Sequence, residues 1–287
     1  MNFKEDYARY QRRVEDELAR LCRACPSPEP LRSAMEYSLL AGGKRIRPVM
    51  LLAACEAFGG SVEEALPFAC ALEMIHTYSL IHDDMPEMDD DDLRRGKPTN
   101  HKVYGQGMAL LAGDGLLSWA FETMLAGASA SGNCLNAMRA LARAAGVSGM
   151  VSGQCRDLEQ KPENGEEELY RLCAEKTGAL LSGAAEAGAA VAGADEATRL
   201  RMRRYGAALG VSFQIKDDLL DIEGDAALLG KATHMDEQRG KMTYPHLLGL
   251  ERAKRVMEEQ TALALDLLGT DAPFLTELTR QLLKRDH

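Results

Sequence analysis

The sequence carries two clusters of aspartates whose spacing predicts chemistry. In the second cluster, Asp217 and Asp221 are four residues apart, so on a helix they lie on one face with Asp218 beside them. These carboxylates interrupt the apolar run from Phe213 to Ile222, and partly buried carboxylates need a counter-cation. The pattern favours a metal ion over a solvated acidic face, which stays as the alternative.

The first cluster has the spacing D-D-x-x-x-x-D at Asp83, Asp84 and Asp89. Pro86 lies between them, and because proline disturbs a helix we expect residues 89–92 to lie on the following loop. A run of aspartates is by itself also typical of a charged loop. Two aspartate clusters at the ends of long helices nevertheless predict a metal site between facing helices of a bundle.

Ligand type indicates which metal to expect. Oxygen ligands without nearby Cys or paired His suit Mg²⁺, which commonly bridges carboxylates to substrate phosphates. The first cluster lacks the glycine and the terminal glutamate of a calcium-binding EF-hand loop. The pair His82-Asp83 is also typical of metal phosphohydrolases, but the other His ligands of such enzymes have no obvious counterpart. Cys22 and Cys25 form a C-x-x-C, but no second Cys or His pair follows at the spacing of a zinc site, so a metal or redox role for these two cysteines is not favoured.

Basic residues follow the pattern expected of a diphosphate site. The segment GGKRIRP, Gly42 to Pro48, places three cations where a loop enters a helix, and a helix N-terminus favours anions. Arg94 and Arg95 directly follow the first aspartate run. Arginine binds phosphate oxygens through two parallel hydrogen bonds, whereas lysine acts as a point charge. Acidic and basic sets together predict a metal-assisted diphosphate site.

The elements that must position these residues are helices. Hydrophobic residues make up 46% and aromatics 5% of the chain, and runs of β-branched residues are scarce. Apolar residues recur at spacings of three and four. Because no low-complexity linker divides the chain, we expect one all-α domain over residues 1–287, a bundle of about ten or more helices around a central cavity. The predicted helices cover residues 5–23, 31–41, 48–58, 62–83, 103–127, 134–155, 167–191, 195–223, 244–268 and 272–284.

Charge and composition restrict the partners and the compartment. The net charge of -10 disfavours nucleic acid, whose phosphates are held mainly by excess Lys and Arg. The 7 cysteines are an odd and scattered set, which suits a reducing compartment. The charged start lacks the apolar core of a signal peptide, and no stretch reaches the ~20 apolar residues of a membrane span. We expect a cytoplasmic protein without stable membrane insertion.

The motifs together resemble the trans-isoprenyl diphosphate synthases, in particular the bacterial farnesyl diphosphate synthases. The resemblance extends from residue 42 to about residue 246 and is carried by GGKRIRP, IHTYSLIHDDMPEMDDDDLRRGKPTNH, AGDGLL, the Lys176-Thr177-Gly178 triplet, FQIKDDLLDIEGD and GKMTYP. It implies the isoprenoid synthase fold, a homodimer, and a prenyltransferase that condenses isopentenyl diphosphate with allylic diphosphates. The expected product is farnesyl diphosphate.

The resemblance also implies roles for individual residues. Asp83, Asp89 and Asp217 would ligate Mg²⁺, which Mn²⁺ would be able to replace, with Asp84, Asp218 and Asp221 as further or outer ligands. The allylic diphosphate would be bound by Arg94, Lys176, Lys231 and Lys241. Isopentenyl diphosphate would be bound by Gly43, Lys44, Arg47, His76 and Arg95. Thr177 and Gln214 would direct oxygens toward the developing carbocation. Because such a cation must be kept from water, a separate hypothesis is that the glycine-flanked segment Gly224 to Gly240, which bears Lys231, closes over the diphosphate as a lid.

Product length is expected to depend on Tyr78. It precedes Asp83 by five residues, roughly 7.5 Å along a helix axis, so its ring can form the floor of the prenyl-tail pocket. Family members with an aromatic residue here resemble farnesyl synthases, and the neighbouring Ser79 is too small to add a barrier. An ordinary core position for Tyr78 stays as the less favoured alternative, and a lone His such as His76 is more often structural.

Three alternatives remain open from the sequence. A geranylgeranyl or geranyl diphosphate synthase would share these motifs and differ in product length. A non-catalytic subunit related to prenyl synthases would be expected to lose one aspartate cluster, and both are present. A terpene cyclase would not need the basic set of Lys44, Arg47 and Arg95. Lys216, next to Asp217, departs from the family pattern and changes the charge near the second cluster.

Overall fold

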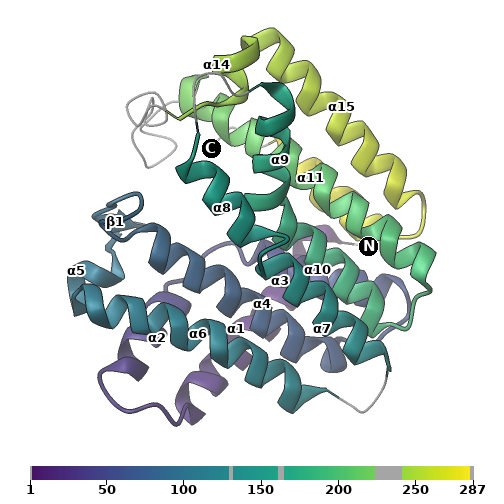
Figure 1. Cartoon of the computed structure of the whole chain (residues 1–287). Coiled ribbons are helices and arrows are strands. Elements are labelled where there is room, and N and C mark those ends of the chain that lie inside the picture. Colours follow the sequence, from purple (N-terminus) through teal and green to yellow (C-terminus); the bar gives the residue numbers. More distant parts are fainter. Residues whose placement is uncertain (1, 129–131, 161–164, 224–240, 285–287) are drawn as a thin grey trace.

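The computed structural model describes residues 2–128, 132–160, 165–223 and 241–284, and most of them are helical (Figure 1). This confirms the prediction of an all-α chain. The helices are α1 (Phe3–Ala24), α2 (Leu31–Leu39), α3 (Ile46–Ala57), α4 (Val62–Asp83), α5 (Asn100–Tyr104), α6 (Gln106–Gly127), α7 (Gly132–Ala145), α8 (Met150–Leu158), α9 (Glu166–Lys176), α10 (Gly178–Val191), α11 (Glu196–Glu223), α14 (Tyr244–Leu248), α15 (Leu250–Leu268) and α16 (Pro273–Lys284).

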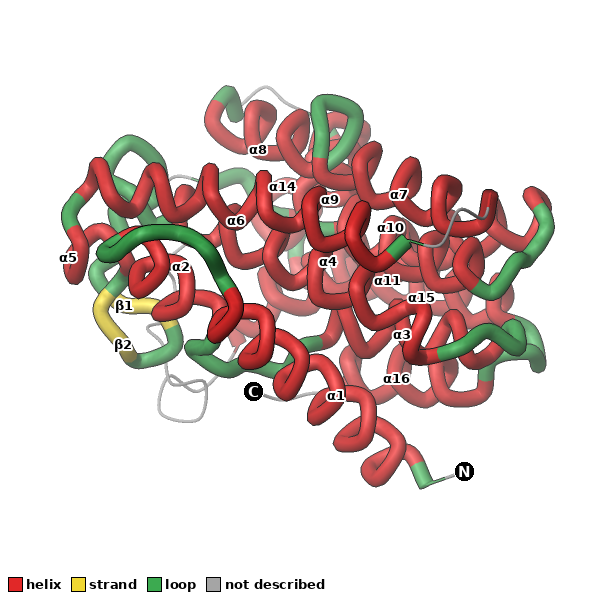
Figure 2. Tube along the Cα trace, turned by 90° about the horizontal axis from the view of Figure 1, so that it is seen from below, coloured by secondary structure: helices red, strands yellow, loops and turns green. Residues whose placement is uncertain are grey.

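Helix α10 lies inside the bundle and packs against α3, α7 and α11 (Figure 2). Its small residues allow this close approach. A Cβ atom on Gly188 would lie 2.3 Å from the backbone oxygen of Leu51 in α3, and one on Gly210 of α11 would lie 2.2 Å from the Cα of Gly178. The apolar character of α10 therefore serves the core. Among the described helices, none is long and apolar enough to cross a membrane.

The structure divides four of the helices that the apolar pattern predicted as continuous. Gly105 and Gly249 have φ angles of +81° and +77°, outside helical geometry, and they separate α5 from α6 and α14 from α15. A turn at residues 146–149 separates α7 from α8, and Thr177 separates α9 from α10. Apolar spacing continued across each break because the helices on both sides have a buried face.

A short antiparallel hairpin, β1 (Leu93–Arg94) and β2 (Lys97–Pro98), follows the first aspartate run. Its two turn residues, Arg95 and Gly96, have φ angles of 55° and 74°, the positive values that a two-residue hairpin turn requires. The hairpin gives the adjacent arginines different partners. Arg94 donates to the carboxylate of Asp84, whereas Arg95 donates to the backbone oxygen of Gly42.

One of the three cations in the GGKRIRP segment belongs to the core. The side chains of Arg45 and Glu73 are each only 2% exposed, and Arg45 Nη1 donates to Glu73 Oε1 over 2.7 Å. Arg45 Nη2 also donates to the backbone oxygen of Leu39 over 2.9 Å. The loop before α3 is thereby anchored to α4, which leaves Lys44 and Arg47 on either side of a fixed residue.

Glu73→Ala is expected to lower the free energy of unfolding by about 3–5 kcal/mol, because it leaves the Arg45 guanidinium buried without its counter-charge. Urea unfolding followed by circular dichroism measures the change. Glu63→Ala is the control, since the Glu63 side chain is 67% exposed where it pairs with Arg13 and should cost less than about 1 kcal/mol. Equal losses in the two variants would contradict the assignment of Arg45 to the core.

Candidate active site

The two aspartate clusters contribute to one cavity of about 760 Å³. Asp83 is the last residue of α4, Asp89 lies on the loop beyond it, and Asp217 lies near the end of α11; all three form part of the cavity wall. Residues 89–92 lie outside the helix, as the proline at position 86 predicted. Two parts of the chain that are far apart in the sequence therefore present three carboxylates to one space.

The other three predicted metal ligands are buried and are not part of this wall. Asp84 caps α4 and accepts a hydrogen bond of 2.9 Å from Arg94 Nε. Asp218 accepts from Gln214 Nε2 over 2.9 Å and from the backbone N–H of Tyr244 over 3.4 Å. Asp221 is 5% exposed. The structure thus divides the six predicted carboxylates into three that line the cavity and three that are buried beside it.

Burial raises the pKa of Asp83, and the nearby Lys176 ammonium opposes this shift. Lys176 and Arg94 both form part of the cavity wall. Lys241 approaches from the chain beyond α11, and its Nζ lies 3.1 Å from Asp89 Oδ1. Three of the four cations predicted for the allylic diphosphate therefore gather around the carboxylates. The fourth, Lys231, lies outside the described residues together with the predicted lid, 224–240.

The second basic set lines an adjoining cavity of about 480 Å³. This cavity contains all five residues predicted to bind isopentenyl diphosphate, which are Gly43, Lys44, Arg47, His76 and Arg95. Gly43 has a φ of +120°, and a Cβ atom there would lie 2.7 Å from the Arg95 guanidinium carbon, so only glycine allows the arginine this close to the loop. Within the described part of the chain, the buried Nε of Arg47 has no hydrogen-bond partner, which suits a donor for a bound anion.

The two cavities share a wall made by Arg47, His76 and Phe213. Burial, reinforced by the positive charge of Arg47, lowers the pKa of His76 well below its ordinary value, so the imidazole is neutral near neutral pH. Its Nε2 lies 3.4 Å from Arg47 Nη1 and can accept a hydrogen bond from it. A carboxylate-lined cavity and a cation-lined cavity therefore adjoin at a partition made of the cationic Arg47, the neutral His76 and the apolar Phe213.

Comparison with known proteins agrees with this geometry. The family model "Polyprenyl synthetase" matches residues 28–278. The chain belongs to the polyprenyl synthetase family. It is 43% identical to farnesyl diphosphate synthase of Bacillus subtilis over 96% of this chain and 95% of the relative. It is 45% identical to geranylgeranyl pyrophosphate synthase 12 of Arabidopsis thaliana over 94% of this chain and 78% of the relative. A crystal structure of an FPP/GFPP synthase from Zymomonas mobilis superposes with a TM-score of 0.86, at 38% identity over 98% of this chain and 99% of that one.

A chain of hydrogen bonds fixes two predicted catalytic residues. Asp218 accepts from Gln214 Nε2 over 2.9 Å, which leaves Gln214 Oε1 to accept from the Thr177 hydroxyl over 2.8 Å. Thr177 lies at the break between α9 and α10, and both Thr177 and Gln214 line the larger cavity. Because the hydroxyl proton is committed to Gln214, the Thr177 lone pairs remain for a positive charge in the cavity.

Tyr78 and Ser79 also line the larger cavity, one to two turns of α4 before Asp83. The Tyr78 side chain is 7% exposed, and its ring meets the His82 ring edge to face with centroids 5.7 Å apart. His82 is itself held, because its Nε2 lies 3.1 Å from the backbone oxygen of Leu110 and its ring fills the space where Gly113 lacks a Cβ. The Tyr78 ring is therefore supported from α6.

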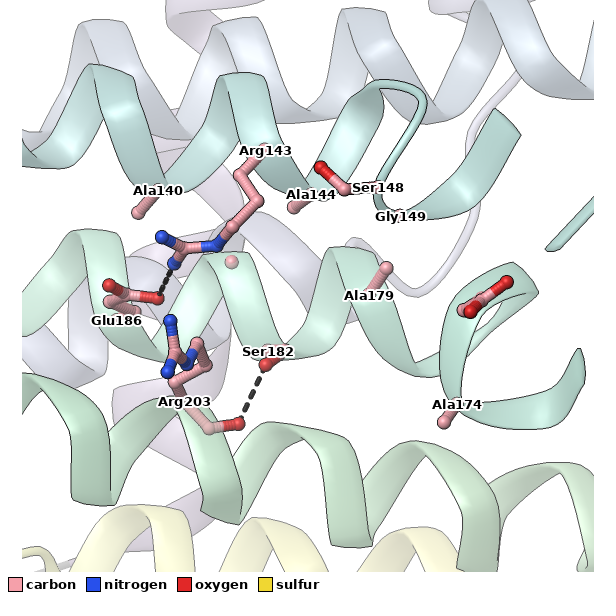
Figure 3. Close-up of a pocket in the computed structure, with 12 residues that line it drawn as sticks. Ala140, Arg143, Ala144, Ser148, Gly149, Ala174, Ala179, Ser182, Glu186 and Arg203 are labelled. Carbon is pink, nitrogen blue, oxygen red and sulfur yellow. Dashed lines mark hydrogen bonds and ion pairs between the residues drawn. The ribbon is translucent and has the colours of Figure 1, made fainter. Parts of the chain in front are cut away.

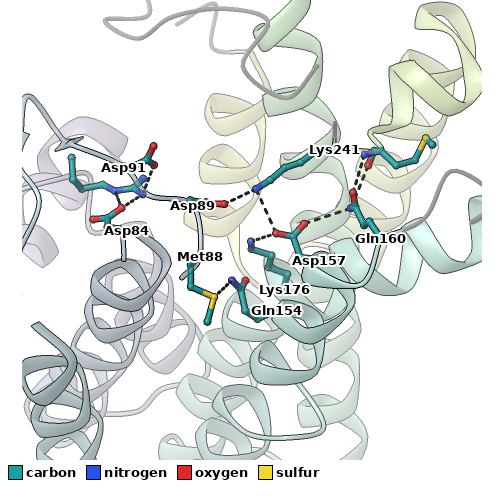
Figure 4. A network of polar contacts seen from close by, with 11 residues as sticks. Asp84, Met88, Asp89, Asp91, Gln154, Asp157, Gln160, Lys176 and Lys241 are labelled. Carbon is teal, nitrogen blue, oxygen red and sulfur yellow. Dashed lines mark hydrogen bonds and ion pairs between the residues drawn. The ribbon is translucent and has the colours of Figure 1, made fainter. Parts of the chain in front are cut away.

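Helix α8 is the part of the candidate site that sequence reasoning missed. It contributes apolar and sulfur-containing residues to the larger cavity, and Asp157 on the same helix accepts from Lys176 Nζ over 2.6 Å (Figure 4). Asp157 stands alone in its stretch of sequence, with no spacing that relates it to either aspartate cluster. The α8 residues in the wall are Met150, Val151, Gln154, Cys155 and Leu158.

A separate cavity of about 270 Å³ lies on the other side of α10, between α7 and α11 (Figure 3). Several of its polar side chains have partners within the protein. Arg143 pairs with Glu186, and the Ser182 hydroxyl donates to the backbone oxygen of Arg203 over 2.6 Å. This cavity shares no lining residue with the other two, and it has no part in the proposed chemistry.

Proposed function

We propose that this chain condenses isopentenyl diphosphate head to tail with dimethylallyl and geranyl diphosphates to give farnesyl diphosphate. The observation that carries the proposal is the partition of Arg47, His76 and Phe213 shared by the two cavities. It supports an arrangement in which the two diphosphates bind in different cavities. One diphosphate would be held by carboxylates, metal ions and cations and the other by cations alone, while the prenyl ends of the two substrates meet at the partition. Such positioning makes the encounter effectively unimolecular, which contributes strongly to rate.

Mg²⁺ is the metal that we propose for the larger cavity. Among the described residues, no three His, Cys, Asp or Glu side chains form a ready-made metal cage. The donor set fits Mg²⁺ in another way, because this ion commonly takes one or two carboxylates together with water and substrate phosphates. Asp83, Asp89 and Asp217 would hold it. When bound, it would add positive charge at the diphosphate that leaves.

The residues of the chain have complementary tasks in this proposal. Arg94 and Lys176 stabilise charge as the allylic carbon–oxygen bond breaks and its electron pair passes to the diphosphate. The Thr177 oxygen faces the resulting allylic cation, whose C1 is attacked by the double bond of isopentenyl diphosphate. The proton then lost goes to the departed diphosphate. The apolar wall from α8 excludes water, which would otherwise capture the cation.

The experiment is incubation of the protein with isopentenyl diphosphate and each of dimethylallyl, geranyl and farnesyl diphosphates, with and without Mg²⁺. We expect Mg²⁺-dependent turnover of the first two substrates and farnesyl as the chief product after dephosphorylation and chromatography. Accumulation of a longer prenyl chain would instead support geranylgeranyl synthesis, which a 45% identical relative is named for. Turnover of an allylic diphosphate without isopentenyl diphosphate would indicate a cyclase. Failure to turn over any pair would overturn the proposal.

We also propose that the chain forms a homodimer through α6. This helix exposes Leu110, Leu111 and Leu125, whose exposed fractions are 47%, 51% and 66%. A second copy of the chain would remove these side chains from water. Leu111→Glu should then convert a dimer into a species near the monomer mass of 31.3 kDa in light scattering. Leu200→Glu, on α11 with 45% exposure, is the control and should stay dimeric. A monomeric wild type, or an unchanged mass for Leu111→Glu, would contradict the proposal.

A further inference from the structure

Asp157 connects the two lysines that approach the larger cavity from different elements. Lys176 Nζ, at the end of α9, lies 2.6 Å from Asp157 Oδ2, and Lys241 Nζ lies 3.5 Å from the same oxygen (Figure 4). The Asp157 side chain is only 9% exposed. One buried carboxylate therefore lies between two ammonium groups that would otherwise repel each other at close range.

Gln160 adds a second connection just beyond the end of α8. Its Oε1 accepts the backbone N–H of Met242 over 2.8 Å, and its Nε2 lies 3.5 Å from the backbone oxygen of Met242. The same Nε2 lies 3.5 Å from Asp157 Oδ1. Gln160 thus holds the backbone next to Lys241, while Asp157 holds the Lys241 side chain. We call these two residues the α8 clasp.

We propose that the α8 clasp positions Lys176 and Lys241 for the allylic diphosphate, with Asp157 as the residue on which both depend. The inference rests on the proposed function, because a diphosphate is the ligand that the two ammonium groups would share. Asp157 is not part of the cavity wall, so it acts through the lysines. An ammonium group has three donors, and Lys176 can keep its bond to Asp157 while it donates to a phosphate oxygen.

A purely structural role for Asp157 predicts a different result. Its ion pairs join α8 to α9 and to the chain that precedes α14, so their loss would then lower stability and leave substrate binding unchanged. A positioning role predicts a selective loss. The isopentenyl set of Lys44, Arg47 and Arg95 lies in the adjoining cavity, and the α8 clasp does not line that cavity. Binding of the allylic substrate alone should therefore suffer.

Asp157→Asn keeps the size of the side chain and removes its charge. We expect it to weaken the binding of inorganic diphosphate, measured by calorimetry with Mg²⁺, on the order of 10- to 100-fold, by analogy with the loss of a group that orients a metal ligand. KM for geranyl diphosphate should rise by a similar factor, while KM for isopentenyl diphosphate changes less than about twofold. Asp157→Glu should restore part of the loss.

Two further variants make the test specific. Glu168→Gln removes a carboxylate that pairs with Arg156 of α8 over 2.9 Å at the surface, and it should leave both KM values unchanged. Gln160→Ala removes the backbone anchor and the 3.5 Å contact with Asp157 Oδ1 but leaves the Asp157 charge in place. It should therefore raise the geranyl diphosphate KM less than Asp157→Asn does, and it tests the clasp if Asp157→Asn does not fold. Wild-type affinity for diphosphate in Asp157→Asn, or an equal rise in both KM values, would overturn the clasp. A wild-type protein without diphosphate binding or turnover would instead overturn the proposed function.

Discussion

Asp83→Asn is expected to lower kcat/KM for the condensation on the order of 10³-fold, about 4 kcal/mol of transition-state stabilisation. The substitution preserves the size of the side chain and removes one of three carboxylates that line the larger cavity. A neutral amide binds Mg²⁺ far more weakly than a carboxylate does, so the diphosphate would depart with less positive charge around it. Steady-state kinetics with geranyl and isopentenyl diphosphates measure the loss.

Asp16→Asn is the matched control, because it makes the same chemical change at an exposed position on α1. Its kcat/KM should equal that of the wild type. Circular dichroism should show both variants folded, because Asp83 is the last residue of α4 and asparagine is also tolerated at the end of a helix. Activity within about tenfold of wild type in Asp83→Asn would exclude a direct role for this carboxylate in metal binding.

Tyr78→Ala is expected to lengthen the product beyond farnesyl by at least one isoprene unit. The Tyr78 ring lines the larger cavity and is supported by His82, which is itself fixed against Leu110 and Gly113 of α6. Truncation to Ala would leave the support in place and remove the barrier, so a growing prenyl chain could extend along α4. Chromatography of the dephosphorylated products measures the change.

Tyr78→Phe is the control for this prediction, because it retains the ring and removes only the hydroxyl. It should give the same product as the wild type. The truncation of a large buried side chain costs roughly 3–5 kcal/mol of stability, so both assays are run at a temperature where circular dichroism shows Tyr78→Ala folded. An unchanged farnesyl peak from folded Tyr78→Ala would place the chain-length barrier elsewhere in the cavity.

Much of the site could be predicted from the sequence because its chemistry requires particular residue types in local patterns. Asp83 and Asp89 are a few residues apart, and Lys44 and Arg47 belong to one loop. The helical class was equally clear, since apolar spacing of three and four residues reports burial along one face. Helix ends were harder. Thr177 interrupts a continuous apolar pattern, and only its packing between α9 and α10 places it at the cavity wall.

Residue types and their spacing were enough to predict that this chain is helical, that its aspartates and basic residues form complementary sets, and that these sets suit diphosphates. The partner of each charged side chain became clear from the folded structure. It paired Arg45 with Glu73 in the core, placed Asp84 against Arg94, and brought the isolated Asp157 between Lys176 and Lys241. The sequence does not indicate which opposite charge a given side chain will pair with, because the strength of an ion pair depends on the distance between the two groups and on their burial in the folded chain.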